Sequence, residues 1–175
     1  QMKNFLSVCL SLVLAAGVLL TPSMSAADTL DDLVLLTENY APYNFEKDGK
    51  IQGVGVDLLI EAFKKTGANK TLEDIQVLPW ARGYKIVQEK KNTVLFTMTR
   101  TEARENMFKW VGPVMASNIV VIAKKSRKIK IRSKDDFGNF KIGAVRDDIG
   151  EAMLLKIGVD SKNIYRTNSS NTTAK

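Results

Sequence analysis

The sequence contains no histidine, and its only cysteine, Cys9, lies close to the N-terminus. These absences exclude the usual histidine and cysteine zinc sites, as well as catalytic triads that use histidine as the base. An enzyme built on this chain would have to use carboxylate, lysine, serine or tyrosine chemistry. We therefore expect neither a metal site nor a cofactor.

Residues 1–27 differ in pattern from everything that follows. One positive charge precedes an apolar run over residues 5–20, and small residues fill the positions before Asp28. This layout predicts a secretory signal peptide, cleaved near Ala27 with Ala26 as the alternative. The rest of the chain is then an exported protein.

Two other interpretations of this N-terminal stretch are less well supported. A transmembrane anchor would need a longer uninterrupted apolar run, whereas Ser7, Ser11 and Gly17 interrupt this one. Lipidation of Cys9 would need an apolar segment before the cysteine, and too few residues precede it.

Removal of residues 1–27 leaves 148 of the 175 residues and takes away Cys9 and one charge, Lys3. The basic residues fall from 26 to 25 against 19 acidic ones, a net charge of +6. Such a chain has no disulfide and must be held together by a hydrophobic core. Its length suits one ordinary domain or two small lobes.

Strand and helix patterns alternate between residues 33 and 107. Short apolar runs of strand length cover residues 33–37, 75–78 and 93–98, and Asp48-Gly49 is typical of a hairpin turn. Apolar residues recur at helical spacing between the runs, first at Val56, Leu59, Ile60 and Phe63 before Gly67, and then at Trp80, Tyr84 and Val87 after Pro79. This order predicts an α/β fold with a mainly parallel sheet.

The segment Gly53-Val54-Gly55 could suggest a dinucleotide-binding loop. The third glycine of that fingerprint is absent, because Val56-Asp57-Leu58 follows directly. We therefore do not expect nucleotide binding.

A candidate anion site lies where the run at residues 93–98 ends. Thr99 and Glu102 have the spacing of a helix capping box, and Arg104 falls in the first helical turn. Free backbone N–H groups and a guanidinium fork suit a carboxylate. The same spacing also fits a plain capped helix with a solvated arginine, so local sequence leaves both interpretations open.

Ligands of open parallel sheets bind beyond the carboxyl ends of the strands. In this chain the loops at that edge are residues 40–45, 79–80 and 97–104. We expect them to converge, which favours the anion-site interpretation.

The second half of the chain is less regular. Residues 114–123 form a long apolar, β-branched run that predicts a strand, and seven of the eleven residues at 124–134 are basic. Nucleic acid or acidic lipid could meet this basic run, but a solvated loop fits better because no aromatic residue interleaves and Asp135-Asp136 follows. We expect no nucleic-acid partner.

Further elements follow the basic run. Ser133 and Asp136 have capping spacing, residues 140–145 and 163–167 predict strands, and a helix is expected from Arg146 to Ile157. Residues 168–175 are polar and predict no element with an apolar face. This part holds only two or three strands and buries little core by itself.

The order of these segments resembles the periplasmic solute-binding proteins of polar amino-acid ABC transporters, the bacterial extracellular solute-binding family 3. The resemblance spans residues 33–167 and rests on five segments: Tyr40-Ala41-Pro42-Tyr43-Asn44-Phe45, Gly53-Val54-Gly55-Val56-Asp57-Leu58-Leu59, Leu78-Pro79-Trp80, Thr97-Met98-Thr99-x-Thr101-x-x-Arg104 and Lys141-Ile142-Gly143-Ala144-Val145. It implies a type II periplasmic-binding-protein-like α/β fold with two lobes.

The resemblance also implies a binding site. Arg104 would pair with a ligand carboxylate with help from Thr99, Thr97 would meet the amino group, Tyr40 would pack over the ligand, and Trp80 would form part of the wall. Met98, Asp147 and Asp148 complete the candidates. Positions 146–148 read Arg-Asp-Asp where the family often has Gly-Thr.

The implied organisation is a first lobe at residues 28–117 and a hinge strand with a partial second lobe at 118–175. The family pattern continues beyond position 175, so we expect a C-terminally truncated chain with an incomplete second lobe. The implied partners are a small amino-acid ligand and an inner-membrane ABC permease, and the full-length protein is expected to be a periplasmic monomer.

The function expected from the resemblance is reversible capture of a polar amino acid or a similar small carboxylate for uptake, without catalysis. One alternative is a dehydratase or lyase on the same scaffold that uses Glu102, Asp147 or Asp148 as acid or base. Another is the sensory ligand-binding domain of a membrane receptor.

Overall fold

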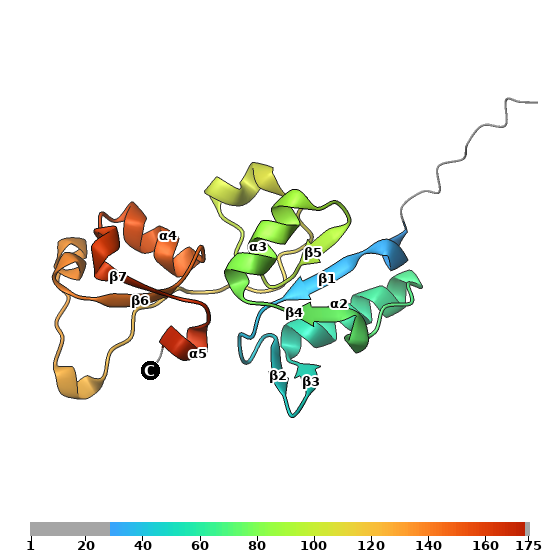
Figure 1. The fold of residues 1–175 in the computed structure, drawn as a ribbon, viewed down its shortest axis with the longest axis horizontal. Coiled ribbons are helices and arrows are strands. Elements are labelled where there is room, and N and C mark those ends of the chain that lie inside the picture. The colour runs from blue at the N-terminus through green and yellow to red at the C-terminus, as the bar shows by residue number, and fades with distance from the viewer. Residues whose placement is uncertain (1–28, 174–175) are drawn as a thin grey trace, which may run out of the picture.

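The structure is a computed structural model that describes residues 29–173. The predicted signal peptide and Cys9 lie outside the described residues. Within them the chain forms two lobes side by side (Figure 1). We call residues 30–110 the first lobe, residues 134–173 the second lobe and residues 111–124 the connecting segment.

A three-stranded parallel sheet forms the centre of the first lobe. Its order is β4-β1-β5, and the strands are β1 (Val34–Thr37), β4 (Ile75–Val77) and β5 (Thr93–Leu95). The α/β prediction is confirmed, with one difference in length. The last strand ends at Leu95 instead of Met98 because Thr97 has a positive φ of 63° and turns the chain out of the sheet.

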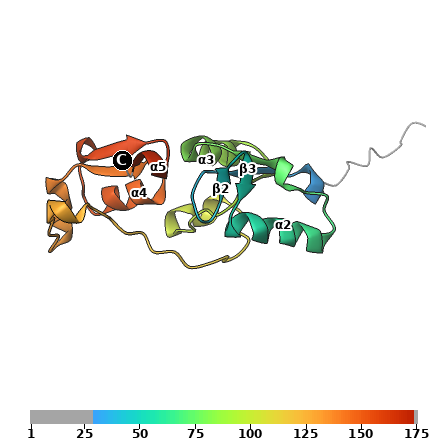
Figure 2. The same cartoon turned by 90° about the horizontal axis from the view of Figure 1, so that it is seen from below.

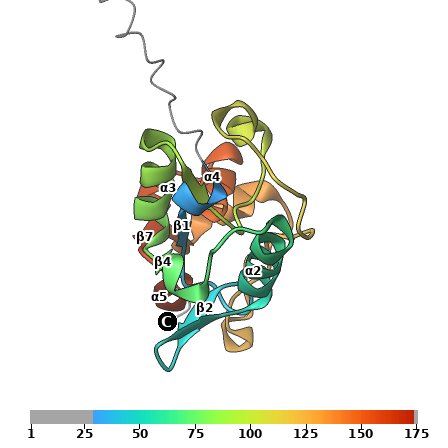
Figure 3. The same cartoon turned by 90° about the vertical axis from the view of Figure 1, so that its right-hand side faces the viewer.

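Two helices cover the opposite faces of this sheet, α2 (Val54–Thr66) and α3 (Trp80–Glu89) (Figure 3). Neighbouring residues of a strand point to opposite faces. Leu35 accordingly packs in one cluster with Val56 of α2, and Leu36 packs in another with Trp80 of α3. Gly67 ends α2 in the left-handed conformation, as the sequence predicts.

The predicted hairpin is present in the first lobe. It pairs β2 (Phe45–Lys47) with β3 (Lys50–Gln52) across Asp48 and Gly49, which both have positive φ. Three 3₁₀ turns complete this lobe, namely η1 (Leu30–Asp32), η2 (Leu72–Asp74) and η3 (Glu102–Met107).

The second lobe is smaller. Two parallel strands, β6 (Ile142–Val145) and β7 (Ile164–Thr167), pack against α4 (Ile149–Lys156) around Leu154. The 3₁₀ turns are η5 (Lys134–Asn139), which starts at the predicted Ser133 cap, and η6 (Ser161–Asn163). A short helix, α5 (Ser170–Thr173), occupies a stretch for which the sequence predicts no element.

The connecting segment corrects the predicted hinge strand at residues 114–123. The segment contains no helix or strand, and its side chains are exposed, by 97% at Val111, 70% at Val120 and 81% at Ile122. A strand needs a neighbour for its backbone groups, and the described part of the chain provides none here. The segment instead runs along the outside between the lobes (Figure 2). The basic run beyond it is exposed, as predicted, with one short turn, η4 (Lys125–Arg127).

Within residues 29–173, no helix combines the length and apolarity that crossing a membrane requires.

Candidate functional site

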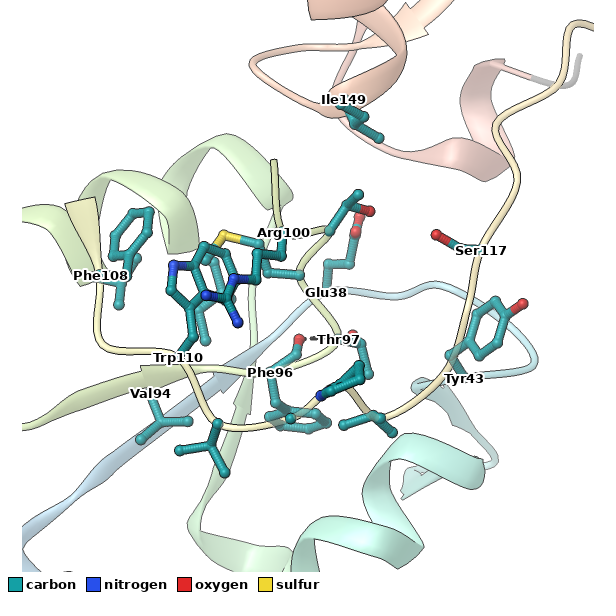
Figure 4. A pocket seen from close by; sticks show the side chains of 18 of the residues that line it. Glu38, Tyr43, Val94, Phe96, Thr97, Arg100, Phe108, Trp110, Ser117 and Ile149 are labelled. Atoms are coloured by element: carbon teal, nitrogen blue, oxygen red, sulfur yellow. Dashed lines mark hydrogen bonds between the residues drawn. The ribbon is translucent and has the colours of Figure 1, made fainter. Parts of the chain in front are cut away.

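The three loops predicted to converge line one cavity of about 940 Å³. Tyr40 and Tyr43 enter from the loop after β1, Trp80 from the start of α3, and Thr97 and Thr99 from the loop after β5. Ile149, at the start of α4, lies across the cavity from Glu38 and Thr97 (Figure 4). The cavity therefore opens at the carboxyl ends of the first-lobe strands and faces the second lobe.

The two glycines that suggested a nucleotide loop have a packing role. A Cβ on Gly53, whose φ is 126°, would lie 2.4 Å from the Tyr43 carbonyl oxygen. A Cβ on Gly55 would lie 2.5 Å from Cγ2 of Thr97. Both positions need glycine so that α2 can approach the cavity loops closely.

Thr97 links two of the cavity loops. A positive φ is uncommon for a β-branched residue, and such strain persists only where the surroundings hold it. Here the Thr97 hydroxyl lies within hydrogen-bonding distance of both the Asn44 side-chain oxygen and the Phe96 carbonyl, while the Asn44 amide donates to the Glu38 carbonyl at 2.7 Å. The loop after β5 is thereby tied to the loop after β1.

The predicted cap of the helix is corrected by two residues. Thr101, and not Thr99, accepts the backbone N–H of Arg104 and starts η3, which is a 3₁₀ turn rather than an α-helix. Glu102 is exposed and does not line the cavity. Thr99 instead contributes its carbonyl oxygen, which accepts from Nη1 of Arg104 at 3.2 Å.

Arg104 is buried, with 6% of its surface exposed. Its guanidinium carbon lies 4.8 Å from the Tyr84 ring centre and 5.5 Å from the Trp80 ring centre. Nη2 donates at 3.2 Å to the carbonyl oxygen of Asp147 in the second lobe. The plain surface-arginine interpretation is therefore wrong, although Arg104 sits beside the cavity next to Thr99 and does not line it.

The remaining predicted residues divide into two groups. Tyr40 packs against Tyr43 with ring centres 5.4 Å apart, and both line the cavity together with Met98 and Asp148. Asp147 does not line it, and its backbone carbonyl instead accepts from Trp80 Nε1 at 2.9 Å and from Arg104.

Sequence reasoning missed Glu38. This residue follows β1 directly, lines the cavity and lies in partly buried surroundings. Burial, reinforced by the nearby charge of Asp148, raises the pKa of Glu38 to about 7. Its position at a strand's carboxyl end was the signal that could have identified it.

Asp148 approaches the same cavity from the second lobe. Burial raises the pKa of its carboxyl, while a backbone N–H from Ile149 and the charge of Arg104 act in the opposite direction. Within the described range no group of three or more histidine, cysteine or acidic side chains is arranged to hold a metal ion. The cavity therefore combines aromatic walls, two partly buried carboxyl groups and an adjacent buried guanidinium.

Comparison with solved structures gives the fold. An ancestral arginine-binding protein bound to glutamine has a TM-score of 0.65 and 20% identity, with 81% of this chain covering 62% of that one. The arginine-, lysine-, histidine-binding protein ArtJ from Geobacillus stearothermophilus has a TM-score of 0.69 and 19% identity, over 81% of this chain and 61% of that one. The arginine-bound truncated ArgBP from T. maritima has a TM-score of 0.64 and 22% identity, over 80% and 66%.

The chain thus spans about three fifths of the length of the first two structures. The shared architecture is the type II periplasmic-binding-protein-like α/β fold with mainly parallel sheets. No curated protein sequence matches the chain. A family model matches residues 33–174, which is most of the chain. The chain belongs to the bacterial extracellular solute-binding proteins, family 3.

Proposed function

We propose that this chain captures a polar amino acid or a similar small carboxylate outside the cytoplasm and delivers it to an ABC importer. One observation carries the proposal: Arg104 is buried, yet no carboxylate of residues 29–173 lies within ion-pair distance of it. A buried charge without a counter-charge is costly. A ligand carboxylate would remove that cost and match the planar fork.

The other cavity residues fit around such a ligand. The Thr97 hydroxyl oxygen is positioned to accept from an α-ammonium group, and Tyr40 and Trp80 supply aromatic walls. Thr99 orients Arg104 through its carbonyl, and Met98 adds an apolar surface. Asp147 and Asp148 approach from the second lobe, so capture would involve both lobes.

The comparisons support an amino-acid ligand. Solved structures of this fold include proteins bound to glutamine and to arginine, and one protein of glutathione import through a cystine ABC importer. The implied partner is an ABC permease of the inner membrane. We further propose that the signal peptide is cleaved near Ala27, that the protein acts in the periplasm as a monomer, and that the lobes divide near residue 118.

Isothermal titration with the twenty amino acids tests the proposal. Arg104→Ala removes a charge-assisted pair worth about 1.5–3 kcal/mol, so affinity should fall at least tenfold. Arg104→Lys keeps the charge but loses the fork, which separates recognition from folding. Arg82→Gln, an exposed arginine of α3, is the matched control. Equal affinity of the Arg104→Ala and Arg82→Gln variants would refute the assigned role.

One observation supports an enzyme as the second candidate. Glu38 and Asp148 line the same cavity, and burial raises the pKa of both, as it does for catalytic acids. Incubation with the amino acid that binds, followed by proton NMR, distinguishes the two functions. An unchanged ligand spectrum supports a receptor, and a new product spectrum supports a dehydratase or lyase.

A further inference from the structure

Two donors of the first lobe converge on one backbone oxygen of the second lobe. The Asp147 carbonyl accepts from Trp80 Nε1 at 2.9 Å and from Arg104 Nη2 at 3.2 Å. Trp80 starts α3 and Arg104 lies in η3, so the two donors come from separate elements of the first lobe. An oxygen held by a guanidinium and an indole N–H occupies the environment that a carboxylate oxygen would occupy.

The second lobe holds this carbonyl in place through a small network. Asp147 has a φ of 59°, and its N–H donates to Glu151 Oε2 at 2.7 Å. Its carboxylate accepts from Arg166 Nη2 at 3.1 Å, and Arg166 also pairs with Glu151, which is 6% exposed. Residues from α4 and β7 therefore fix the direction in which the Asp147 carbonyl points.

We propose that the Asp147 carbonyl is a built-in competitor for the carboxylate site, a latch that joins the two lobes while no ligand is bound and that a ligand carboxylate displaces. The network of Glu151 and Arg166 positions the latch. The displacement part rests on the function proposed above, whereas the latch itself can be tested without any ligand.

The chemistry makes this exchange favourable in one direction. A peptide carbonyl carries no net charge, so the latch satisfies a donor of Arg104 without neutralising the guanidinium. A carboxylate adds the attraction of its own negative charge and can accept two parallel N–H groups of the guanidinium, whereas the carbonyl accepts only one of them. The latch is therefore strong enough to orient the lobes and weak enough to yield to a charged ligand.

Two substitutions at position 147 separate the backbone from the side chain. Asp147→Gly removes the carboxylate but accepts a positive φ readily, so the carbonyl should remain in place. Asp147→Pro fixes φ near −65° and removes the N–H that bonds Glu151, so the carbonyl should turn away. The side chain of Asp147 is about half exposed, so its removal should leave the fold intact, and the dispersion of the amide signals checks this.

Indole NMR signals of the ligand-free protein provide the measurement. The chain has two tryptophans, and Trp110 Nε1 donates to the Glu105 carbonyl within the first lobe, so it serves as an internal reference. We expect the Trp80 indole proton to exchange with water at least fivefold faster in Asp147→Pro than in Asp147→Gly. The Trp110 signal should stay the same in both variants.

A third variant tests the positioning network. The Glu151→Gln/Arg166→Gln double substitution should also accelerate Trp80 exchange, whereas Arg146→Gln, one residue before the latch, should not. Equal Trp80 exchange in Asp147→Pro and Asp147→Gly, with native amide dispersion in both, would overturn the latch.

Glycine is the probe for displacement because it carries only the α-carboxylate and α-ammonium groups. If the carbonyl competes, glycine should bind Asp147→Pro more tightly than Asp147→Gly, and saturation should release the Trp80 signal in the native chain. Equal glycine affinity in the two variants would refute competition. Absence of binding of glycine and of the other nineteen amino acids in every variant, together with a changed Trp80 signal in Asp147→Pro, would contradict the proposed function but leave the latch intact.

Discussion

Both lobes pack helices against a parallel sheet, but the sheet and the core are larger in the first lobe. The first lobe sandwiches three parallel strands between α2 and α3, with an apolar cluster on each face of the sheet, and the cluster on the α3 face also includes Val145 of β6. The second lobe has two parallel strands and a single main cluster around Leu154. The larger core supports strained loops and a buried cation, whereas the smaller lobe presents a backbone carbonyl and a partly buried carboxyl group.

The treatment of buried charge differs in the same way. In the second lobe the buried carboxylate of Glu151 pairs with Arg166. Among the described residues, the buried guanidinium of Arg104 in the first lobe donates only to carbonyl oxygens and packs on aromatic rings. Structural charges in folded proteins are normally paired, so the unpaired one marks the place where a ligand is expected.

Truncations in the two cores should give the largest difference between the lobes. Leu35→Ala in the first lobe and Leu154→Ala in the second should each cost about 2–5 kcal/mol of unfolding free energy. Both tryptophans lie in the first lobe, so the unfolding midpoint measured by their fluorescence should fall with Leu35→Ala only. Far-UV circular dichroism reports the unfolding of both lobes. Equal shifts of the fluorescence midpoint would mean that the lobes unfold as one unit.

One glycine substitution in each lobe tests the difference in packing. Gly53→Ala should destabilise the first lobe by about 2–3 kcal/mol, since the added Cβ meets the Tyr43 carbonyl and φ is positive. Gly138 in η5 has open space around it, so Gly138→Ala in the second lobe is the matched control and should change stability by less than about 1 kcal/mol. Urea denaturation of the two variants measures both values, and a similar loss in each would contradict the close approach at Gly53.

The Glu38 carboxyl makes stability depend on pH. Its pKa is about 7 in the folded protein against an ordinary 4.5, so the folded state keeps a proton that the unfolded state releases between these values. The associated stability is fully present below pH 4.5 and falls as pH rises to 7. Glu38→Gln should therefore gain about 3 kcal/mol over the native chain at pH 8 and nothing at pH 4.

Denaturant curves at the two pH values test the Glu38 prediction. The exposed hairpin residue Glu46 provides the control, because Glu46→Gln should leave the slope with pH unchanged. A native chain with constant stability from pH 4.5 to 7 would show that Glu38 is ionised throughout and that its surroundings are wetter than the structure indicates.

Substitutions in the connecting segment should change the stability of the protein least. Val120 and Ile122 are largely exposed, so replacing both with serine should change stability by less than about 0.5 kcal/mol. Thermal unfolding provides the measurement. A loss above about 2 kcal/mol would indicate that these side chains are buried in solution and would restore the hinge strand predicted from the sequence.

Local pattern was sufficient for most of the fold. Short apolar runs located the strands of both sheets, period-3.6 spacing located α2, α3 and α4, and Asp48-Gly49 located the hairpin, because each signal depends on neighbouring residues. The short helix α5 was missed. The strand predicted at residues 114–123 was wrong for the opposite reason. Its apolar, β-branched residues favour a strand, but a strand requires a partner elsewhere in the molecule, which sequence spacing does not reveal.

The site was predicted in outline only. The position of Arg104 after a strand's end was enough to single it out, and the convergence of the three loops follows from strand direction in a parallel sheet. Its aromatic neighbour Tyr84, the cap at Thr101 and the carbonyl of Asp147 were not foreseen. These contacts join residues from different helices, strands and loops. Asp147 in particular acts through its backbone carbonyl, which the type of its side chain does not indicate.

The exposed connecting segment also sets how strong a contact between the lobes needs to be. The lobes are joined by residues 111–133, and an open chain of that length would have a root-mean-square span of about 26 Å. Two bodies tethered at that distance experience an effective concentration in the millimolar range. A contact too weak to hold separate molecules together can then keep the lobes associated for much of the time. The segment thus acts as a tether that makes weak, easily exchanged hydrogen bonds sufficient.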